Sequence, residues 1–294
     1  MYKMKGSIAV LIGAASFGVL STFVKKAYQQ GFSLAEVTGI QAGLGLLFLW
    51  FAWLILLLLP NTSKRRSKRL TSPYTIIISG ISTGAVSMLY YKSIELVPAS
   101  LAIILLMQYI WIGQLIELLW FKSKPNRADI MMVGLVLIGT VLATGALEHP
   151  ISYFSPTGII YGLLAATAYS IFIIVNGRVG NDYPAVQKSA LMITGAFLFI
   201  IIVLQPWSLL SAPVFYGILK YGLLLALFGT VLPPLLFAYG MPRTGYSLGA
   251  VLSTIELPVA VVMSYWILLE PVSWIKWLGV AIILGTIVWK NRRA

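Results

Sequence analysis

Long apolar stretches recur along the whole chain, and short polar segments separate them. Each stretch is about 20 residues long, which is the length of α-helix that crosses the hydrocarbon core of a bilayer. We predict ten spans, at residues 6–24, 34–59, 74–95, 99–121, 128–147, 156–176, 186–205, 216–239, 246–269 and 273–290. The pattern therefore predicts an all-α membrane protein with ten transmembrane helices.

The composition agrees with this prediction. Of the 294 residues, 59% are hydrophobic and 10% are charged, and the mean hydropathy is +0.92. In a soluble protein the net charge of +13 would suggest nucleic-acid binding, but here the basic residues lie between the apolar stretches, where Lys and Arg set topology. We expect membrane lipids as partners and no nucleic acid.

The distribution of Lys and Arg predicts the orientation. If the N-terminus lies in the cytoplasm, sixteen of the 21 basic residues fall on the cytoplasmic side, and the other five are Lys25, Lys26, Lys92, Lys220 and Lys276. The dense run from Lys64 to Arg69 is interpreted as a topology anchor with affinity for anionic headgroups. Both termini are therefore expected in the cytoplasm.

The two halves of the chain resemble each other. Residues 6–48 align with 158–200 at a shift of 152, and later matches follow at shifts of 147 and 146. Each half holds five predicted spans, and because five is odd, the second half must enter the membrane upside down relative to the first. We expect two inverted repeats, at residues 1–147 and 148–294.

Short motifs occur in a fixed order along both halves. The first half contains Gly13-Ala-Ala-Ser-Phe-Gly18 and, at 90–102, Tyr-Tyr-Lys-Ser-Ile-Glu-Leu-Val-Pro-Ala-Ser-Leu-Ala. The second half contains Ser-Thr-Ile-Glu-Leu-Pro-Val-Ala at 253–260 and Leu-Glu-Pro at 269–271. In this order the motifs resemble the drug/metabolite transporter (DMT) superfamily, specifically its bacterial EamA type. The chain departs from that pattern at Gln41, where many members carry Arg.

The resemblance implies a multi-pass transporter of the bacterial plasma membrane. It also implies that the first, third, fourth, sixth, eighth and ninth helices enclose a central cavity. Tyr91, Trp111 and Tyr169 would then be aromatic walls of that cavity.

One carboxylate, Glu256, lies inside the apolar span 246–269. An ionisable residue at that depth is costly unless it is paired, hydrated or protonated, so Glu256 is a candidate to accept a proton or the cationic group of a solute. Alternatively, Glu256 could donate to a backbone carbonyl that Pro258 leaves without a helical partner. Both interpretations stay open. In the repeat alignment Glu256 corresponds to Tyr109.

The span 99–121 carries polar or aromatic residues at every third position, which predicts a slanting row on one side of a helix. The row consists of Gln108, Trp111, Gln114 and Glu117. We expect Gln108 and Trp111 near mid-span to bind solute, and Glu117 to pair with a basic loop residue near the cytoplasmic end. Substrate lining and interhelical packing remain equal alternatives for the row.

Small residues with one aromatic residue mark two further helix faces. Ser87 and Tyr91 belong to the first face and Tyr169 to the second. Close helix packing in lipid also needs small residues, so packing and solute binding remain alternatives here. In the span 216–239, the adjacent Pro233 and Pro234 remove backbone hydrogen bonds and predict a kink, which could serve as a gate.

Aromatic faces with one carboxylate suit an organic cation or the ammonium group of an amino acid. The mid-span regions hold no Lys or Arg for a phosphate group, and the chain has no P-loop motif for ATP. It has no Cys and a single His, so we expect no metal and no cofactor. No polar catalytic cluster is evident, so an enzyme is not expected.

The predicted function is secondary transport, in the direction of export, of small amino-acid-like or amphipathic metabolites or drugs by alternating access. Protons are candidate coupling ions. The alternatives are a uniporter or importer for an organic cation, and a membrane scaffold or channel without carrier activity. The sequence gives no indication of the oligomeric state.

Overall fold

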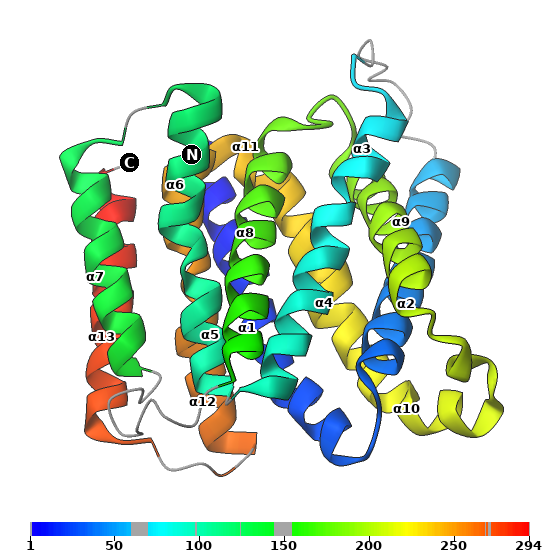
Figure 1. The fold of residues 1–294 in the computed structure, drawn as a ribbon. Coiled ribbons are helices and arrows are strands. Elements are labelled where there is room, and N and C mark those ends of the chain that lie inside the picture. The colour runs from blue at the N-terminus through cyan, green and yellow to red at the C-terminus, as the bar shows by residue number, and fades with distance from the viewer. Residues whose placement is uncertain are drawn as a thin grey trace.

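The computed structural model describes residues 2–59, 70–97, 99–123, 125–143, 155–267, 269 and 272–293. All regular secondary structure in these residues is helical (Figure 1). The first half contains α1 (Tyr2–Gln29), α2 (Leu34–Leu58), α3 (Pro73–Ser79), α4 (Ile81–Leu96), α5 (Ala99–Met107), α6 (Tyr109–Phe121) and α7 (Arg127–Ala143). The second half contains α8 (Pro156–Arg178), α9 (Ala185–Leu204), the 3-10 helix η3 (Trp207–Leu210), α10 (Ala212–Leu225), the π-helix η4 (Ala226–Val231), α11 (Leu232–Ser253), α12 (Glu256–Ile267) and α13 (Trp274–Arg293). The basic run 64–69, His149 and Pro271 lie outside the described residues.

Local sequence signals mark where several helices begin. At the start of α2, Ser33 Oγ accepts the Glu36 N–H and the Glu36 carboxylate accepts the Ser33 N–H, which is a capping box. At the start of α8, Ser155 Oγ accepts the Gly158 N–H, and Pro156 occupies the first turn, where its missing N–H costs no hydrogen bond. These caps satisfy donors that the first helical turn leaves without partners.

Six segments of the described chain are long and apolar enough to cross a membrane. They are Met4–Gln29, Leu34–Leu58, Leu101–Phe121, Pro156–Arg178, Ala185–Leu204 and Ala212–Ile267. The predicted spans 74–95, 128–147 and 273–290 are helical in their described parts but are not among the six.

The segment Ala212–Ile267 has 56 residues and is too long for a single crossing. It turns at Gly245, whose φ of 74° and ψ of 169° are not helical and are adopted most easily by glycine. Figure 1 shows α10 and the first part of α11 running in one direction, and the rest of α11 with α12 running back.

Helices from the two halves of the chain pack side by side. α1 lies along α11, α4 along α8, α2 along α9, and α7 along α13. Figure 1 also shows that α1 begins and α13 ends at the same end of the bundle, where α6 connects to α7 and α8 to α9. We call this end the terminal end.

Two predicted spans break near their middle. α5 gives way to α6 at Gln108, and α11 gives way to α12 at residues 254–255. The second break is explained by Pro258, whose ring would clash with the carbonyl of Thr254 in a continuous helix. That carbonyl instead accepts the Leu257 N–H at 3.1 Å, in a tighter 3-10 turn.

Pro233 and Pro234 lie buried in the first turn of α11, directly after η4. Because two adjacent prolines remove two N–H donors, the carbonyls one turn earlier lose their usual α-helical partners. The preceding residues are wound as a π-helix. The kink predicted at these prolines and its role as a gate both remain predictions.

Candidate functional site

Glu256 is the first residue of α12 and lies inside the bundle, where it is 5% exposed. The Tyr169 hydroxyl on α8 donates to Glu256 Oε2 at 3.2 Å. Pro258 has no N–H to donate to the Thr254 carbonyl, and that carbonyl accepts the Leu257 N–H instead. Among the hydrogen bonds of the described residues, Tyr169 donates to the Glu256 carboxylate and none joins that carboxyl to the Thr254 carbonyl.

α1 comes very close to the backbone at this break. A Cβ atom added to Gly18 would lie 2.4 Å from the Glu256 carbonyl oxygen, which is closer than any side chain permits. Gly18 ends the small-residue motif of the first span. That motif therefore serves close packing of α1 against α12, beside the carboxylate.

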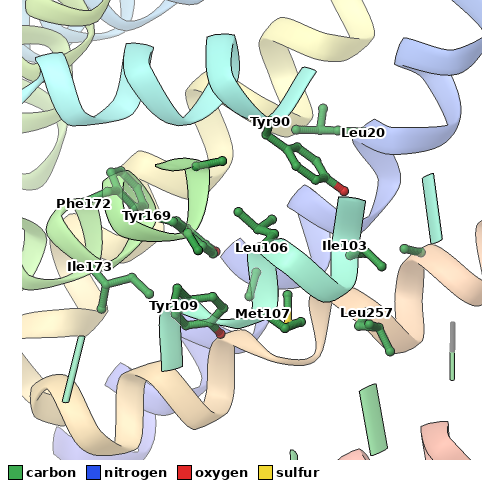
Figure 2. Packing of buried hydrophobic residues seen from close by; sticks show 14 of the residues in the cluster. Leu20, Tyr90, Ile103, Leu106, Met107, Tyr109, Tyr169, Phe172, Ile173 and Leu257 are labelled. Atoms are coloured by element: carbon green, nitrogen blue, oxygen red, sulfur yellow. The ribbon is translucent and has the colours of Figure 1, made fainter. Parts of the chain in front are cut away.

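Four buried tyrosines from three helices lie near Glu256, and one of them, Tyr169, is in direct contact with its carboxylate. We call them the tyrosine cluster; they are Tyr90 and Tyr91 on α4, Tyr109 on α6, and Tyr169 on α8, all at most 6% exposed. Each of them interacts electrostatically with Glu256. The rings of Tyr109 and Tyr169 are 4.7 Å apart between centroids and lie next to each other in Figure 2.

The hydroxyl groups of the cluster are fixed by further contacts. The Tyr91 hydroxyl donates to Gln41 Oε1 at 2.8 Å, and the Tyr109 hydroxyl donates to the Ala250 carbonyl at 2.9 Å. Gln41, the position that departs from the family pattern, thus reaches the cluster through Tyr91. These contacts fix the hydroxyl groups of Tyr91 and Tyr109 on partners other than Glu256.

Phenylalanines continue the aromatic wall behind Tyr169. Phe17 contacts the Tyr169 ring edge-on at 5.9 Å between centroids, and Phe172 stacks on it at 5.8 Å. Phe17 is the residue that the repeat alignment pairs with Tyr169. The described surroundings of Glu256 are therefore one carboxylate among aromatic rings and hydroxyl groups.

Gln108 and Trp111 form a pair of their own. Trp111 Nε1 donates to Gln108 Oε1 at 2.7 Å, and Gln108 Nε2 donates to the Ile104 carbonyl at 3.0 Å. Trp111 is 42% exposed, whereas Glu117, further along the expected row, is 6% exposed. The expectation of a row on one side of the helix is wrong, because each step of three residues drifts back by about 60° around the axis.

Ser87 lies on α4, one turn before the two tyrosines of that helix. Its hydroxyl donates to the Thr83 carbonyl at 3.4 Å, and the side chain is half-buried. The structure therefore brings Tyr91 and Tyr169 to Glu256, and places the predicted residues Ser87, Gln108 and Trp111 in contacts of their own.

Sequence reasoning left Tyr90 and Tyr109 out of the site. A signal for Tyr109 existed, because the repeat alignment matches it to Glu256. Each is the first residue after a helix break, Tyr109 at the start of α6 and Glu256 at the start of α12. Tyr90 had no separate signal beyond its neighbour Tyr91.

Two adjoining cavities, of about 250 and 310 Å³, lie at the terminal end. Both are lined by Glu117, Arg178, Gly245 and Tyr246. Arg178, at the end of α8, donates to Glu117 through Nη2 at 2.6 Å and through Nε at 3.2 Å. The expectation that Glu117 pairs with a base is confirmed, although that base is the last residue of α8 and not a loop residue.

Tyr246 stands between these cavities and the tyrosine cluster. It follows the turn at Gly245, lines both cavities, and donates its hydroxyl to the Tyr109 carbonyl at 3.0 Å. Tyr109 in turn packs on Tyr169, the hydrogen-bond donor to Glu256. Tyr246, Tyr109 and Tyr169 therefore form a chain of contacts from the cavity wall to the buried carboxylate.

A second ion pair joins the two halves of the chain at the same end. The Lys290 ammonium on α13 contacts the Asp129 carboxylate on α7, and Ser247 Oγ donates to the same carboxylate at 2.8 Å. Within the described residues, no group of three or more His, Cys, Asp or Glu is arranged to hold a metal ion.

Comparison with known proteins gives one consistent result. The chain matches the EamA-like transporter family over residues 4–145 and 156–291. It is 24% identical over 257 residues to "Uncharacterized transporter YcbK" of Bacillus subtilis (strain 168), which is 84% of this chain and 80% of that protein. A solved structure described only as a crystal structure of a protein shares the fold with a TM-score of 0.71 and 17% identity, covering 97% of this chain and 99% of the other. This multi-pass membrane protein therefore belongs to the EamA-like transporter family.

Proposed function

We propose that this transporter is a secondary carrier that exports small amino-acid-like or amphipathic metabolites or drugs, with Glu256 at the centre of its solute site. The observation that carries the proposal is the buried Glu256 carboxylate, 5% exposed and hydrogen-bonded by Tyr169 among four tyrosines. A carboxylate with aromatic faces around it binds an ammonium or quaternary amine by ion pairing and cation–π attraction. Intramembrane carboxylates also serve as proton carriers, so Glu256 is our candidate for proton coupling.

We further propose ten membrane crossings in two inverted repeats, residues 1–147 and 148–294, with both termini in the cytoplasm of a bacterial plasma membrane. In this scheme α3 with α4, and α5 with α6, are single interrupted crossings, and α11 supplies parts of two. The packing of α1 on α11 near Gly240, and of α8 on α4 near Val97, supports the scheme. In each case the first crossing of one repeat packs on the third crossing of the other, as a two-fold relation requires.

A gate that opens and closes the cavity during alternating access needs places where a helix can bend. The π-helix before Pro233 and Pro234 and the break before Pro258 supply such places, because their hydrogen-bond ladders are already interrupted. We assign these three prolines to gating. Tyr91 and Tyr169 are assigned as aromatic walls.

Ser87, Gln108 and Trp111 are proposed as solute contacts along the path in other states of the cycle. The Gln108–Trp111 pair lies at the α5–α6 break, so bending there would reorient both side chains. This assignment depends on movement at Gln108.

Flux measurements with the purified chain in liposomes test the proposal. We expect saturable, competitively inhibited flux of amino acids or quaternary amines, and no flux of sugar phosphates. Flux that rises linearly with concentration would indicate a channel. A chain that folds and moves none of these solutes would contradict the proposed function.

A further inference from the structure

The Arg178 guanidinium lies at the boundary of both terminal-end cavities, and its side chain is 45% exposed. Glu117 occupies two of its N–H groups, one on Nε and one on Nη2. An arginine has five such donors in a rigid fork. Within the described part of the chain, no other hydrogen bond of Arg178 occurs, so the edge formed by Nη1 and Nη2 has unused donors.

The guanidinium is held in a defined orientation. Glu117, with a side chain 9% exposed, fixes one edge, and the Phe121 ring lies 3.8 Å from the guanidinium carbon and supports one face. A fixed arginine loses less side-chain freedom when it binds a further anion than a mobile surface arginine does. The edge formed by Nη1 and Nη2 also has the geometry for two parallel hydrogen bonds to a carboxylate.

The surrounding cavities also offer an acceptor for the ammonium group of a small zwitterion and an apolar surface for its side chain. Glu117 can accept an ammonium group beside the bound carboxylate, because each carboxylate oxygen accepts more than one hydrogen bond. Ile173, Ile174 and Met241 line the smaller cavity and offer an apolar surface. The larger cavity adds Gln114 as an amide.

We propose that Arg178 and Glu117 form a second solute site at the terminal end, in which Arg178 binds the carboxylate of a small zwitterion and Glu117 binds its ammonium group. This site deepens the proposed function and rests on it. The described surroundings of Glu256 contain a carboxylate and phenols, so that site recognises the ammonium group. The carboxylate of the same solute is recognised at Arg178, on the other side of Tyr246.

The Glu117–Arg178 pair also joins α6 to α8, so a purely structural role has to be separated from binding. A structural tie between the helices would affect all solutes equally. A carboxylate site affects only those solutes that carry a carboxylate.

The test measures binding of L-leucine and leucinamide to the purified full chain by isothermal titration. Leucinamide keeps the ammonium group and the side chain and lacks the carboxylate. We expect wild-type protein to bind leucine about tenfold or more tightly than leucinamide, the usual effect of hydrogen bonds to a charged group. Arg178→Gln is expected to abolish this preference, because it weakens the binding of leucine by about tenfold or more relative to that of leucinamide.

Two further variants control the measurement. Arg243→Gln removes another arginine near the terminal end that lines neither cavity, and the preference should persist. Arg178→Lys keeps the charge beside Glu117 but lacks the fork, and an intermediate preference is expected. The Lys variant supplies the test if the Gln variant does not fold.

The outcomes separate this proposal from the proposed function. If leucinamide binds and leucine binds no more tightly, the Arg178 site is wrong and the amine site at Glu256 stands. If Arg178→Gln weakens both ligands equally, the pair is a structural tie and the proposal is wrong. If wild-type protein binds neither ligand, the Arg178 site is contradicted, and the liposome flux of quaternary amines decides the proposed function.

Discussion

Gly195→Ala tests whether the glycines at the contact between α3 and α9 are needed for close packing. Where α9 passes α3, a Cβ on Gly195 would lie 1.7 Å from the Ile77 carbonyl oxygen. In the same contact, a Cβ on Gly80 would lie 1.8 Å from the Met192 carbonyl oxygen. Both neighbours are backbone atoms of packed helices, so neither can rotate away and the helices must separate.

The expected cost follows from that separation. Overpacking of this kind costs about 1–3 kcal/mol, and the better helix propensity of Ala offsets about 0.5–1 kcal/mol. Because a 1.7 Å approach to a backbone atom puts this substitution at the upper end of that range, we expect Gly195→Ala to lower the free energy of unfolding by about 2 kcal/mol, and the melting temperature by a few degrees.

The assay is thermal unfolding in detergent, followed by intrinsic fluorescence. Gly285→Ala on α13 is the matched control, because a Cβ there meets no atom within 4 Å. The control should melt at the wild-type temperature or slightly above it. If Gly195→Ala and Gly285→Ala melt at the same temperature, the close approach of α3 and α9 is wrong.

Two further contacts give predictions. Asp182 lies in the α8–α9 connection. Burial raises the pKa of its carboxyl, but hydrogen bonds from the Thr71 N–H and hydroxyl and from the Leu70 N–H lower it by more, so the pKa lies below its usual value. A carboxyl whose pKa is lowered in the folded state stabilises the fold at pH values above its unfolded-state pKa of about 3.9. This stabilisation is lost as the pH falls through the folded-state pKa. Asp182→Asn should therefore lower the melting temperature at pH 7, and its difference from wild type should shrink between pH 5 and pH 3; a constant difference would refute this. Tyr246→Phe removes the hydroxyl that donates to the Tyr109 carbonyl and should cost about 1 kcal/mol in chemical unfolding; an unchanged unfolding midpoint would exclude that bond.

Signals local in the sequence predicted a good part of the fold. Hydrophobic length located the helices, and the prolines at 233, 234 and 258 marked interrupted backbone, because a missing N–H acts within one turn. Glu256 stood out because a carboxylate in an apolar span is energetically costly unless it is paired, hydrated or protonated.

The features that were missed depend on contacts between distant helices. The break at Gln108 has no proline or glycine at that position, and its clearest sequence counterpart is the break at 254–255 in the other half. Tyr109 became part of the site because α6 packs against α8. Trp111 is exposed because residues spaced by three do not stay on one face of a helix that has 3.6 residues per turn.

Liposome flux of the Glu256→Gln variant, measured as a function of pH, tests whether Glu256 binds the proton or the cationic group of the solute. Glu95→Gln is the matched control, because Glu95 is an exposed carboxylate paired with Lys92 on α4. We predict that Glu256→Gln abolishes the pH dependence or the preference for cationic solutes, while Glu95→Gln behaves as wild type. Unchanged kinetics in a Glu256→Gln variant that inserts and folds normally would leave Glu256 with a structural role only.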